Sequence, residues 1–419
     1  MVRMQPVMNG WTGGQYSVFR AVFGSYLFVH FVQLLPWGAE LFSRRGMLPD
    51  GSASPLLHLF PNLLALWDAS LAVTLLLGAG ALLSLLLAAG WRDRYAAVGL
   101  WYIWACLLGR NPLISNPGLP YVGWILLAHA FLPPAPYGSW DGRGRPDPGT
   151  TWRMPQGIYR VAWVLMALGY SYSGYTKLVS PSWLDGTALA RVLENPLARG
   201  NFLGDIMLSM PGAFLQLATW GALAMELLFA PLSLVSRLRP WVWLSMLLLH
   251  FSLIALIDFA DLSLGMVMLH GFTFNPAWLG ALRKPEPEML FYDGDCGLCQ
   301  HTVRFVLAED PAGDLFHFAP LQSEAFLRAV PAARRKGLPD SVVVLTSSGT
   351  LFTRSRAIWY ILNCLGGLWR ILGFLGGLLP TRLCDTIYDG IARVRHHLFR
   401  PPPSACPLVP EPLRRRFHH

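Results

Sequence analysis

Long apolar stretches separated by short polar segments fill the first two thirds of this chain. About 20 apolar residues cross a bilayer as a helix, and runs of that kind occur eight times. They lie at roughly 17–36, 62–89, 95–109, 118–133, 157–178, 213–236, 240–257 and 262–281. The third and fourth runs are short and have prolines nearby, so they are compatible with full spans, tilted spans or a re-entrant pair. The pattern predicts a polytopic α-helical membrane bundle of about eight spans.

The pattern changes after the polar, proline-bearing segment Arg283–Glu288. Shorter apolar runs bounded by turn residues now predict strands and helices. The predicted strands are 289–292, 315–319, 341–346 and 350–353, and the predicted helices are 300–308 and 355–365. This order, β-α-β-(α)-β-β-α, is typical of a small α/β thioredoxin-like domain, and a helical tail follows over 366–399. We therefore expect a membrane domain over 1–282, a linker over 283–288 and an α/β domain over 289–419.

The composition of the 419 residues fits this division. Apolar residues make up 53% of the chain and charged residues 14%, against about 25% charged residues in soluble domains. Together with a mean hydropathy of +0.41, these values exclude a disordered chain and argue against a single soluble globule. The net charge of +9 comes from basic residues scattered between apolar runs, which indicates membrane orientation rather than nucleic-acid binding.

The basic residues between the apolar runs also predict how the bundle is oriented. With eight spans, both termini lie on one side, and that side carries ten Lys and Arg residues against five on the other. Because cytoplasmic loops are enriched in basic residues, both termini are expected in the cytoplasm. The chain is thus predicted to be an integral multi-pass protein of the plasma membrane or bacterial inner membrane. The lipid bilayer surrounds its bundle, and its α/β domain lies in the cytoplasm.

Two of the six cysteines form the one closely spaced pair, Cys296-Gly297-Leu298-Cys299. A cysteine at a helix N-terminus has its thiolate stabilised by unpaired backbone N–H groups and by the helix dipole. A second cysteine three residues later lies one turn away and can resolve a mixed disulfide, so the pair favours redox chemistry. Two other interpretations stay open, namely a pair of inert thiols or half of a zinc site. Zinc would need two further ligands, for which the candidates are Cys384, Cys406, His396 and His397.

The sequence around this pair sharpens the prediction. The run FYDGDCGLC, at Phe291–Cys299, resembles the signature of the DCC family of thiol-disulfide oxidoreductases. Further matches follow in the family's order, at Phe318–Ser323, Thr353–Ala357, Tyr388–Arg395 and Cys406-Pro407. The resemblance covers about 289–417 and implies a thioredoxin-like fold, with Cys296 as nucleophile and Cys299 as resolving thiol. We expect a thiol partner, either a protein or a small thiol like glutathione.

Two acidic residues, Asp293 and Asp295, belong to this signature. Acids beside a nucleophilic cysteine disfavour its thiolate unless a cation offsets them. A downstream family motif, TRSRA, supplies Arg354 and Arg356 on either side of Ser355. Either arginine could be the offsetting cation.

The membrane part carries one lysine, Lys177, at the end of an apolar run. An ionisable residue at that depth is a functional candidate, although a lysine near a span end can also extend to the headgroups. Tyr170, Ser173 and Lys177 follow at i, i+3 and i+7 and therefore share a helix face. Burial disfavours the charged amine, so a lysine in this setting can act as a base.

The surrounding residues carry a second resemblance. The run YSYSGYTKLVSPSWLDG, at Tyr170–Gly186, is similar to a motif of vitamin K-dependent gamma-carboxylases and of the wider HTTM (horizontally transferred transmembrane) family. His250, followed by Leu262–Met266, matches a second motif of that family. The resemblance covers roughly 12–280 and implies that Lys177 aligns with the proposed base of the carboxylase.

Three functions are compatible with these features. The first is a membrane-bound thiol-disulfide oxidoreductase whose transmembrane bundle binds a quinone or another apolar substrate. The second is a gamma-carboxylase-like enzyme with Lys177 as base, and the third is a non-enzymatic membrane transporter or scaffold. A quinone is the one cofactor suggested, no metal is favoured, and no nucleic-acid partner is expected. The expected site residues are Cys296, Cys299 and Lys177 as catalytic groups, supported by Asp293, Asp295, Arg354, Ser355, Arg356, Tyr170, Ser173 and His250.

Overall fold

The structure, a computed structural model, describes residues 9–258, 260–398 and 409–418. Contacts within the chain divide it into two compact units. The mixed unit comprises Met1–Arg20, Pro133–Met154 and Asn275–His419, and the helical unit comprises Ala21–Leu132 and Pro155–Phe274. Cys406 and Pro407, which the DCC resemblance included, lie outside the described residues.

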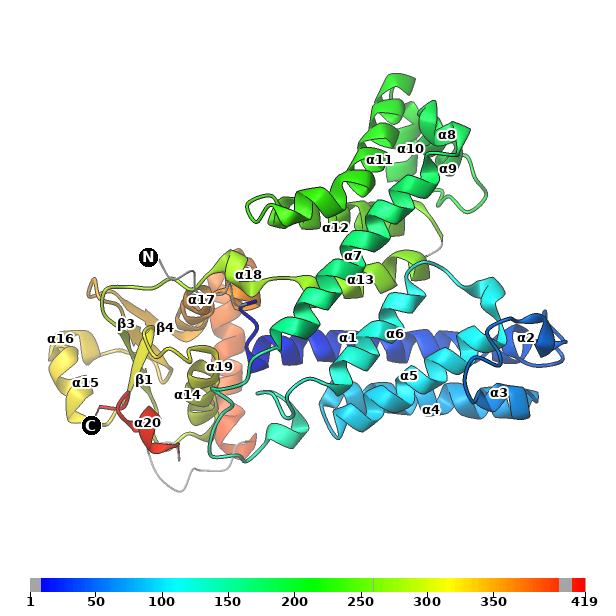
Figure 1. Ribbon diagram of the computed structural model, residues 1–419. Coiled ribbons are helices and arrows are strands. Elements are labelled where there is room, and N and C mark those ends of the chain that lie inside the picture. The colour runs from blue at the N-terminus through cyan, green and yellow to red at the C-terminus, as the bar shows by residue number, and fades with distance from the viewer. Residues whose placement is uncertain (1–8, 259, 399–408, 419) are drawn as a thin grey trace, which may run out of the picture. The chain divides into compact units, whose positions relative to one another are not determined.

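The helical unit consists of α-helices and the segments that connect them (Figure 1). Its helices are α1 (Gly13–Leu34, which begins in the mixed unit), α2 (Gly38–Phe42), α3 (Leu63–Leu66), α4 (Ser70–Ala89), α5 (Asp93–Arg110), α6 (Leu119–Ala130), α7 (Gln156–Lys177), α8 (Pro181–Leu184), α9 (Ala188–Leu193), α10 (Phe202–Ser209), α11 (Gly212–Leu234), α12 (Arg239–Leu256) and α13 (Ala260–Thr273). Within the described part of the chain, four helices are long and apolar enough to cross a membrane, namely α1, α4, α11 and α12. These four indicate a membrane protein, whereas the count of eight spans stays a prediction.

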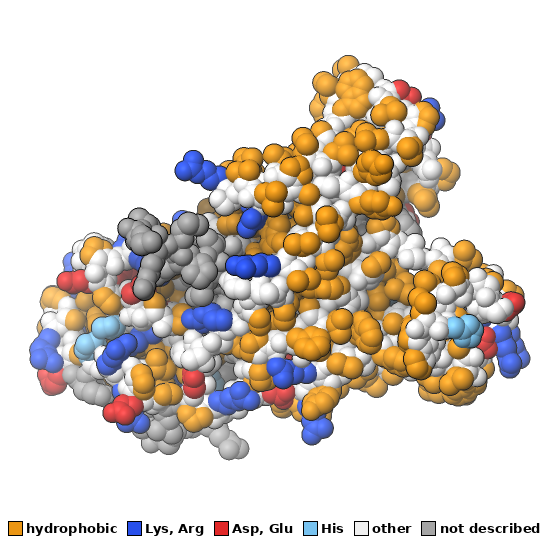
Figure 2. Space-filling model, in the orientation of Figure 1, with side chains coloured by type: hydrophobic (Ala, Val, Ile, Leu, Met, Phe, Trp, Pro, Cys, Tyr) orange, Lys and Arg blue, Asp and Glu red, His pale blue; other side chains and the backbone are white. Residues whose placement is uncertain are grey.

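Figure 2 shows hydrophobic side chains spread over the surface of the helical unit, whereas charged side chains are more frequent on the mixed unit.

Inside the helical unit, a side chain of α7 donates a hydrogen bond to a carbonyl of α11 that lacks its usual donor. Pro231 of α11 has no N–H to donate to the carbonyl of Leu227, and Ser171 Oγ of α7 donates to that carbonyl instead, at 3.1 Å. The two helices can approach closely because Gly174 has no Cβ. A Cβ there would lie only 2.7 Å from the Leu227 nitrogen. Serine and glycine thus let a proline-containing helix keep its backbone paired, which an apolar environment demands.

The α/β part of the mixed unit is built on a four-stranded sheet in the order β2-β1-β3-β4. The strands are β1 (Glu288–Tyr292), β2 (Phe316–Pro320), β3 (Val343–Leu345) and β4 (Leu351–Thr353). β2 runs parallel to β1, while β3 and β4 continue the sheet in antiparallel pairs. The helices are α14 (Gly297–Glu309), α15 (Glu324–Ala329), α16 (Ala332–Arg335), α17 (Arg354–Leu365), α18 (Gly367–Gly377), α19 (Thr381–Leu398) and α20 (Glu411–Arg414). The predicted order of strands and helices is confirmed, and the predicted helical tail forms two helices, α18 and α19.

Alternation along β1 buries side chains on both faces of the sheet. Leu290 and Tyr292 belong to one core, shared with residues of α14 and α17. Phe291 belongs to a second core on the opposite face, where its ring meets that of Phe326 in α15 at 4.9 Å between centroids. Figure 1 shows α14 and α17 on one side of the sheet and α15 and α16 on the other. This two-sided burial fixes the end of β1, from which the CxxC loop leaves.

Two segments far away in the sequence, 9–20 and 133–154, pack with this α/β domain. The buried carboxylate of Glu309, at the end of α14, accepts hydrogen bonds from Thr12 Oγ1, from Gly14 N–H at 2.9 Å and from Trp369 Nε1. Burial raises the pKa of Glu309, and the three donors oppose that rise. The start of α1 is therefore held by the α/β domain. The division at 282 and 289, which follows sequence order, stays a prediction.

Candidate functional site

The CxxC pair lies where β1 ends and α14 begins. Cys296 is the N-cap residue of α14, and its Sγ accepts a hydrogen bond from Cys299 N–H at 3.4 Å. The Cys296 sulfur thus lies at the positive end of the helix dipole, which attracts negative charge. Both thiols are free, and the two residues are only 1% and 3% exposed. The geometry of the pair is the predicted one, while the catalytic roles of the two thiols stay a prediction.

Asp293 shapes the loop that presents Cys296. Its Oδ1 accepts hydrogen bonds from Asp295 N–H at 3.1 Å and from Gln322 Nε2 at 3.2 Å. Its backbone carbonyl accepts from Cys296 N–H at 3.3 Å. The Asp295 side chain is exposed. Asp293 therefore closes the turn before Cys296, whereas Asp295 contributes its backbone N–H to the same turn.

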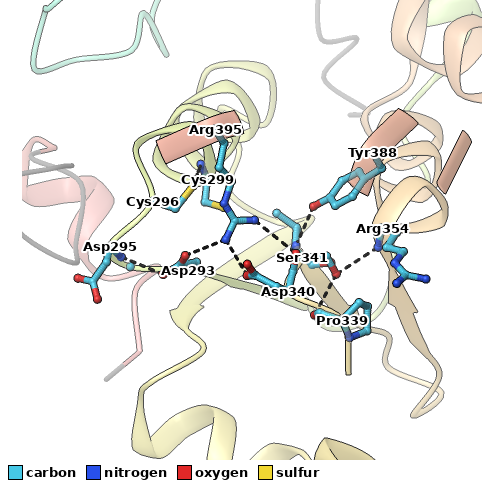
Figure 3. A network of polar contacts seen from close by, with 12 residues as sticks. Asp293, Asp295, Cys296, Cys299, Pro339, Asp340, Ser341, Arg354, Tyr388 and Arg395 are labelled. Carbon is cyan, nitrogen blue, oxygen red and sulfur yellow. Dashed lines mark hydrogen bonds and ion pairs between the residues drawn. The ribbon is translucent and has the colours of Figure 1, made fainter. Parts of the chain in front are cut away.

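A cation from the far end of the domain reaches this loop (Figure 3). Arg395 of α19 is 2% exposed, and its Nη2 lies 3.1 Å from Asp293 Oδ2 and 2.6 Å from Asp340 Oδ1. Burial opposes its charge, but Asp340 and the nearby Cys296 and Cys299 raise the pKa of Arg395 above its usual value. Arg395 is thus a permanent positive charge beside the pair.

The two arginines expected in that place lie elsewhere. Arg354 Nε pairs with Asp389 Oδ1 at 3.0 Å, and Arg356 is exposed. Sequence reasoning missed Arg395. A signal was present, since Arg395 is the last residue of one of the DCC motifs. The cation expected beside the two acids was sought in the wrong motif, since nothing local in the sequence shows that α19 returns to the CxxC loop.

Polar contacts fasten α19 to its neighbours and so position Arg395. Ser355 donates from N–H and Oγ to Asp385 Oδ1, at 3.3 and 2.5 Å. Val342 N–H, just before β3, donates to Tyr388 Oη at 3.1 Å. Ser355 therefore affects the sulfurs only indirectly, by holding the helix that carries Arg395.

Cys299 differs chemically from an ordinary exposed thiol. Burial first, and the neighbouring Cys296 second, raise the pKa of Cys299 to about 12. At neutral pH it is a protonated thiol, and a protonated thiol is not a nucleophile. The arrangement therefore favours attack by Cys296 before Cys299.

A cavity of about 320 Å³ adjoins Cys299. Residues of α14, α17 and α19 line it, and among them are Ile358, Trp359, Ile387 and Ile391. Arg395 lies in the same lining. Cys299 thus borders a mainly apolar space that carries one buried cation.

Metal ligation finds little support among the described side chains, where no group of three or more His, Cys, Asp or Glu could hold an ion. Of the four zinc ligands considered, Cys384 lies in the cavity wall. Cys406 lies outside the described residues, as do the side chains of His396 and His397. The zinc interpretation is therefore untested at three of its four candidate ligands.

The second candidate site lies at the end of α7 in the helical unit. Lys177 Nζ donates to Ser173 Oγ at 2.8 Å and forms an ion pair with Glu226 of α11. Nζ also lies 5.0 Å from the ring centroid of Trp183. Ser173 and Lys177 thus share a helix face, as the spacing predicted. The ion pair with Glu226 was not foreseen.

Tyr170 belongs to a separate hydrogen-bonded chain inside the helical unit. Its Oη lies 2.6 Å from His250 Nε2 and 3.5 Å from His270 Nδ1. His250 Nδ1 in turn lies 3.3 Å from Ser263 Oγ. The structure brings the expected residues Tyr170 and His250 together, and it adds His270 and Ser263.

Comparisons with known proteins identify the C-terminal domain. Residues 290–401 match a family model described as DCC1-like thiol-disulfide oxidoreductase. The uncharacterized protein YuxK of Bacillus subtilis (strain 168) is 32% identical over 134 residues, which are 31% of this chain and 93% of YuxK. A chloroplastic DCC family protein of Arabidopsis thaliana is 31% identical over 114 residues, which are 27% of this chain and 65% of that protein.

No solved structure is significantly similar to the chain. The HTTM resemblance of the membrane part stays a prediction, since the family model matches residues 290–401. Residues 290–401 contain the CxxC pair and Arg395. Through this C-terminal domain, the chain belongs to the family of DCC1-like thiol-disulfide oxidoreductases.

Proposed function

We propose that this chain is a membrane-bound thiol-disulfide oxidoreductase with a thioredoxin-like C-terminal domain. One observation carries the proposal, namely the Cys296 sulfur at the N-terminus of α14 with Cys299 one turn inside and Arg395 close to both. The sheet order β2-β1-β3-β4 and the family match support it. Four helices apolar enough to span a bilayer support membrane attachment.

In the proposed reaction, the Cys296 thiolate attacks one sulfur of a partner disulfide. A bond forms between Cys296 Sγ and that sulfur, and the other partner sulfur leaves as a thiolate that takes a proton from water. Cys299 then gives up its proton and attacks Cys296 Sγ, which releases the first partner sulfur. The partner gains two electrons, and Cys296 and Cys299 end as a disulfide. The same steps in reverse oxidise a partner dithiol.

The environment of the two sulfurs supports this order. The high pKa of Cys299 keeps the resolving thiol protonated while the mixed disulfide forms. Arg395 places a positive charge beside the sulfurs, where negative charge moves during exchange. The cavity next to Cys299 offers room for an apolar side chain of a protein partner.

A trapping experiment tests the proposal. Full-length Cys299→Ser protein, incubated with oxidised glutathione, should accumulate a mixed disulfide with one glutathione at Cys296, because the resolving thiol is missing. Mass spectrometry of the intact protein and of its peptides reads the adduct. The Cys364→Ser protein is the matched control, since Cys364 is a buried free thiol of the same domain. A Cys299→Ser protein that gains no glutathione, or gains it at another cysteine, would overturn the proposal.

For the location of this domain we propose the cytoplasm, on the balance of basic residues between the apolar runs. Membrane-impermeant maleimide applied to inside-out vesicles, but not to intact cells, should then label a cysteine placed at exposed Arg356. Labelling of Arg356→Cys in intact cells would place the domain outside and change the span count by one.

For the helical unit we propose an apolar ligand, with a quinone as the expected class. Tyr170 and His250 are buried hydrogen-bonding groups inside the helical unit, and such groups can donate to quinone carbonyls. Decylubiquinone should quench the tryptophan fluorescence of the wild-type protein saturably, and His250→Ala should weaken that binding. Non-saturable quenching, equal in both proteins, would contradict a quinone site.

The gamma-carboxylase-like alternative depends on Lys177 as a base. In the structure, Lys177 is held by Glu226 and Ser173, so a substrate can reach its amine only after those contacts open. Substrate-dependent incorporation of labelled bicarbonate that disappears in Lys177→Ala would favour the alternative. A transporter or scaffold would show neither thiol exchange nor carboxylation.

A further inference from the structure

Helices α18 and α19, with the turn that joins them, expose an unusual number of large apolar side chains for the surface of an α/β domain. Ten of them are 38–67% exposed, and we call them the α18–α19 face. They are Ile371, Leu372, Phe374, Leu375, Leu378, Leu379, Leu383, Ile387, Ile391 and Val394. An exposed apolar surface of this kind marks an interaction site rather than a chance exposure.

The sequence directs these side chains outward. In α18, two glycines face α17, and a Cβ on Gly376 would lie 2.6 Å from the ring of Trp359. Because the small residues occupy the packed side, the leucines and the phenylalanine are left on the outer side. In α19 the exposed apolar residues recur at i, i+4, i+8 and i+11 from Leu383, which forms one stripe along the helix.

The charges around the face are mainly basic. Arg382 and Arg393 are exposed on α19 and fall to one side of its apolar stripe. The two acidic residues of the helix are engaged within the domain, since Asp385 accepts from Ser355 and Asp389 pairs with Arg354. The outward charge beside the face is therefore positive, which complements anionic headgroups.

The position of α18 identifies the surface that the face meets. Leu368 N–H, in the first turn of α18, donates to Gln15 Oε1 at 2.9 Å. Gln15 lies in the first turn of α1, which is a candidate membrane span. The next residue of α18, Trp369, donates to Glu309 of α14 and so fixes the start of α18 on the α/β domain. Helix α18 thus begins beside the first turn of a candidate membrane span.

From these observations we propose that the α18–α19 face docks on the membrane surface, with its apolar side chains at the boundary of headgroups and acyl chains and its arginines on anionic phospholipids. The proposal rests on the membrane attachment under Proposed function. Ile387 and Ile391 belong both to this face and to the lining of the cavity beside Cys299. Docking would therefore bring the thiol site next to the lipid headgroups.

The test uses full-length protein in nanodiscs of phosphatidylcholine with and without phosphatidylglycerol. Spin labels are placed singly at Leu378→Cys and Ile387→Cys, and the parent protein gives the background from native thiols. Leu327→Cys on α15 is the matched control, because Leu327 is an exposed leucine of the same unit outside the face. Collisions with oxygen and with a water-soluble nickel chelate report whether each label contacts lipid or water.

We expect the ratio of oxygen to nickel accessibility to be several-fold higher at positions 378 and 387 than at position 327. Adding phosphatidylglycerol should raise it further, and Arg382→Gln with Arg393→Gln should reverse that increase. Labels as water-accessible as the control would overturn the proposal. Labels shielded from both reagents would also overturn it, because a protein surface would then cover the face. A chain that does not enter nanodiscs at all would instead refute the membrane attachment, whatever its thiol chemistry.

Discussion

The two candidate sites differ in how far apart in the sequence their residues lie. At the cysteine site, Arg395 reaches Asp293 across 102 residues. At the lysine site, Lys177 bonds Ser173 four residues away on the same helix and Glu226 49 residues away on the next long one. A site built from distant motifs depends on the folding of a whole domain, whereas a site on two packed helices depends on the packing of that one pair of helices.

The largest expected effect separates the two sites. Cys296→Ser should reduce thiol-disulfide exchange to the background rate, because a hydroxyl forms no disulfide. Lys177→Ala should leave the exchange rate unchanged. Reduction of a fluorescent glutathione disulfide by the full-length proteins measures both. A well-folded Lys177→Ala protein that also lost exchange would show that the two sites are coupled.

The pH dependence of alkylation sharpens the contrast within the CxxC pair. Because burial raises the pKa of Cys299 to about 12, its alkylation by iodoacetamide should rise about tenfold per pH unit across the alkaline range. At pH 7, the label should be found at Cys296. The same shift lowers the stability of the fold as the pH rises above the ordinary thiol range, because only the unfolded chain then releases the Cys299 proton. Peptide mass spectrometry after a brief pulse gives the site. Substantial label at Cys299 at pH 7 would refute the assigned order of attack.

Removing the long-range cation should cost stability as well as chemistry. Arg395→Ala leaves Asp293 without its buried partner, and we expect a loss of about 2–3 kcal/mol, below the full range for a buried pair because Asp340 is exposed. Arg395→Lys should recover part of this loss, since it restores the charge but not the planar fork. Thermal unfolding in detergent reports the change. If Arg395→Ala were as stable as Arg356→Ala, the network would not hold the loop.

The smallest expected effect concerns the contact that fastens α19. Tyr388→Phe removes the acceptor of Val342 N–H and should lower the free energy of unfolding by about 1–2 kcal/mol. The control is Tyr172→Phe, because Tyr172 is exposed on α7 and should show no change. Equal stability of both variants would mean that water satisfies the Val342 N–H.

The fold of the α/β domain was largely predictable, because its strands are short apolar runs bounded by turns. The third strand was predicted to begin two residues too early and to end one residue too late, since the pattern does not show where pairing with β1 begins and ends. The cysteine geometry was predictable from local spacing. Arg395 and Glu226 were missed because long-range partners depend on which helices return to a site. The packing of residues 9–20 against the domain left no local signal.

That last contact has a consequence for how the protein is made. Thr12 and its partner Glu309 lie 297 residues apart, and chains are synthesised at about 5–20 residues per second, so the partner emerges about 15–60 s later. The backbone N–H of Gly14, at the start of α1, finds its acceptor only when that partner arrives. Helix α1 therefore receives this cap from a segment that is translated after all four candidate spans. A chain that has not yet been extended as far as Glu309 therefore lacks this acceptor for the Gly14 N–H.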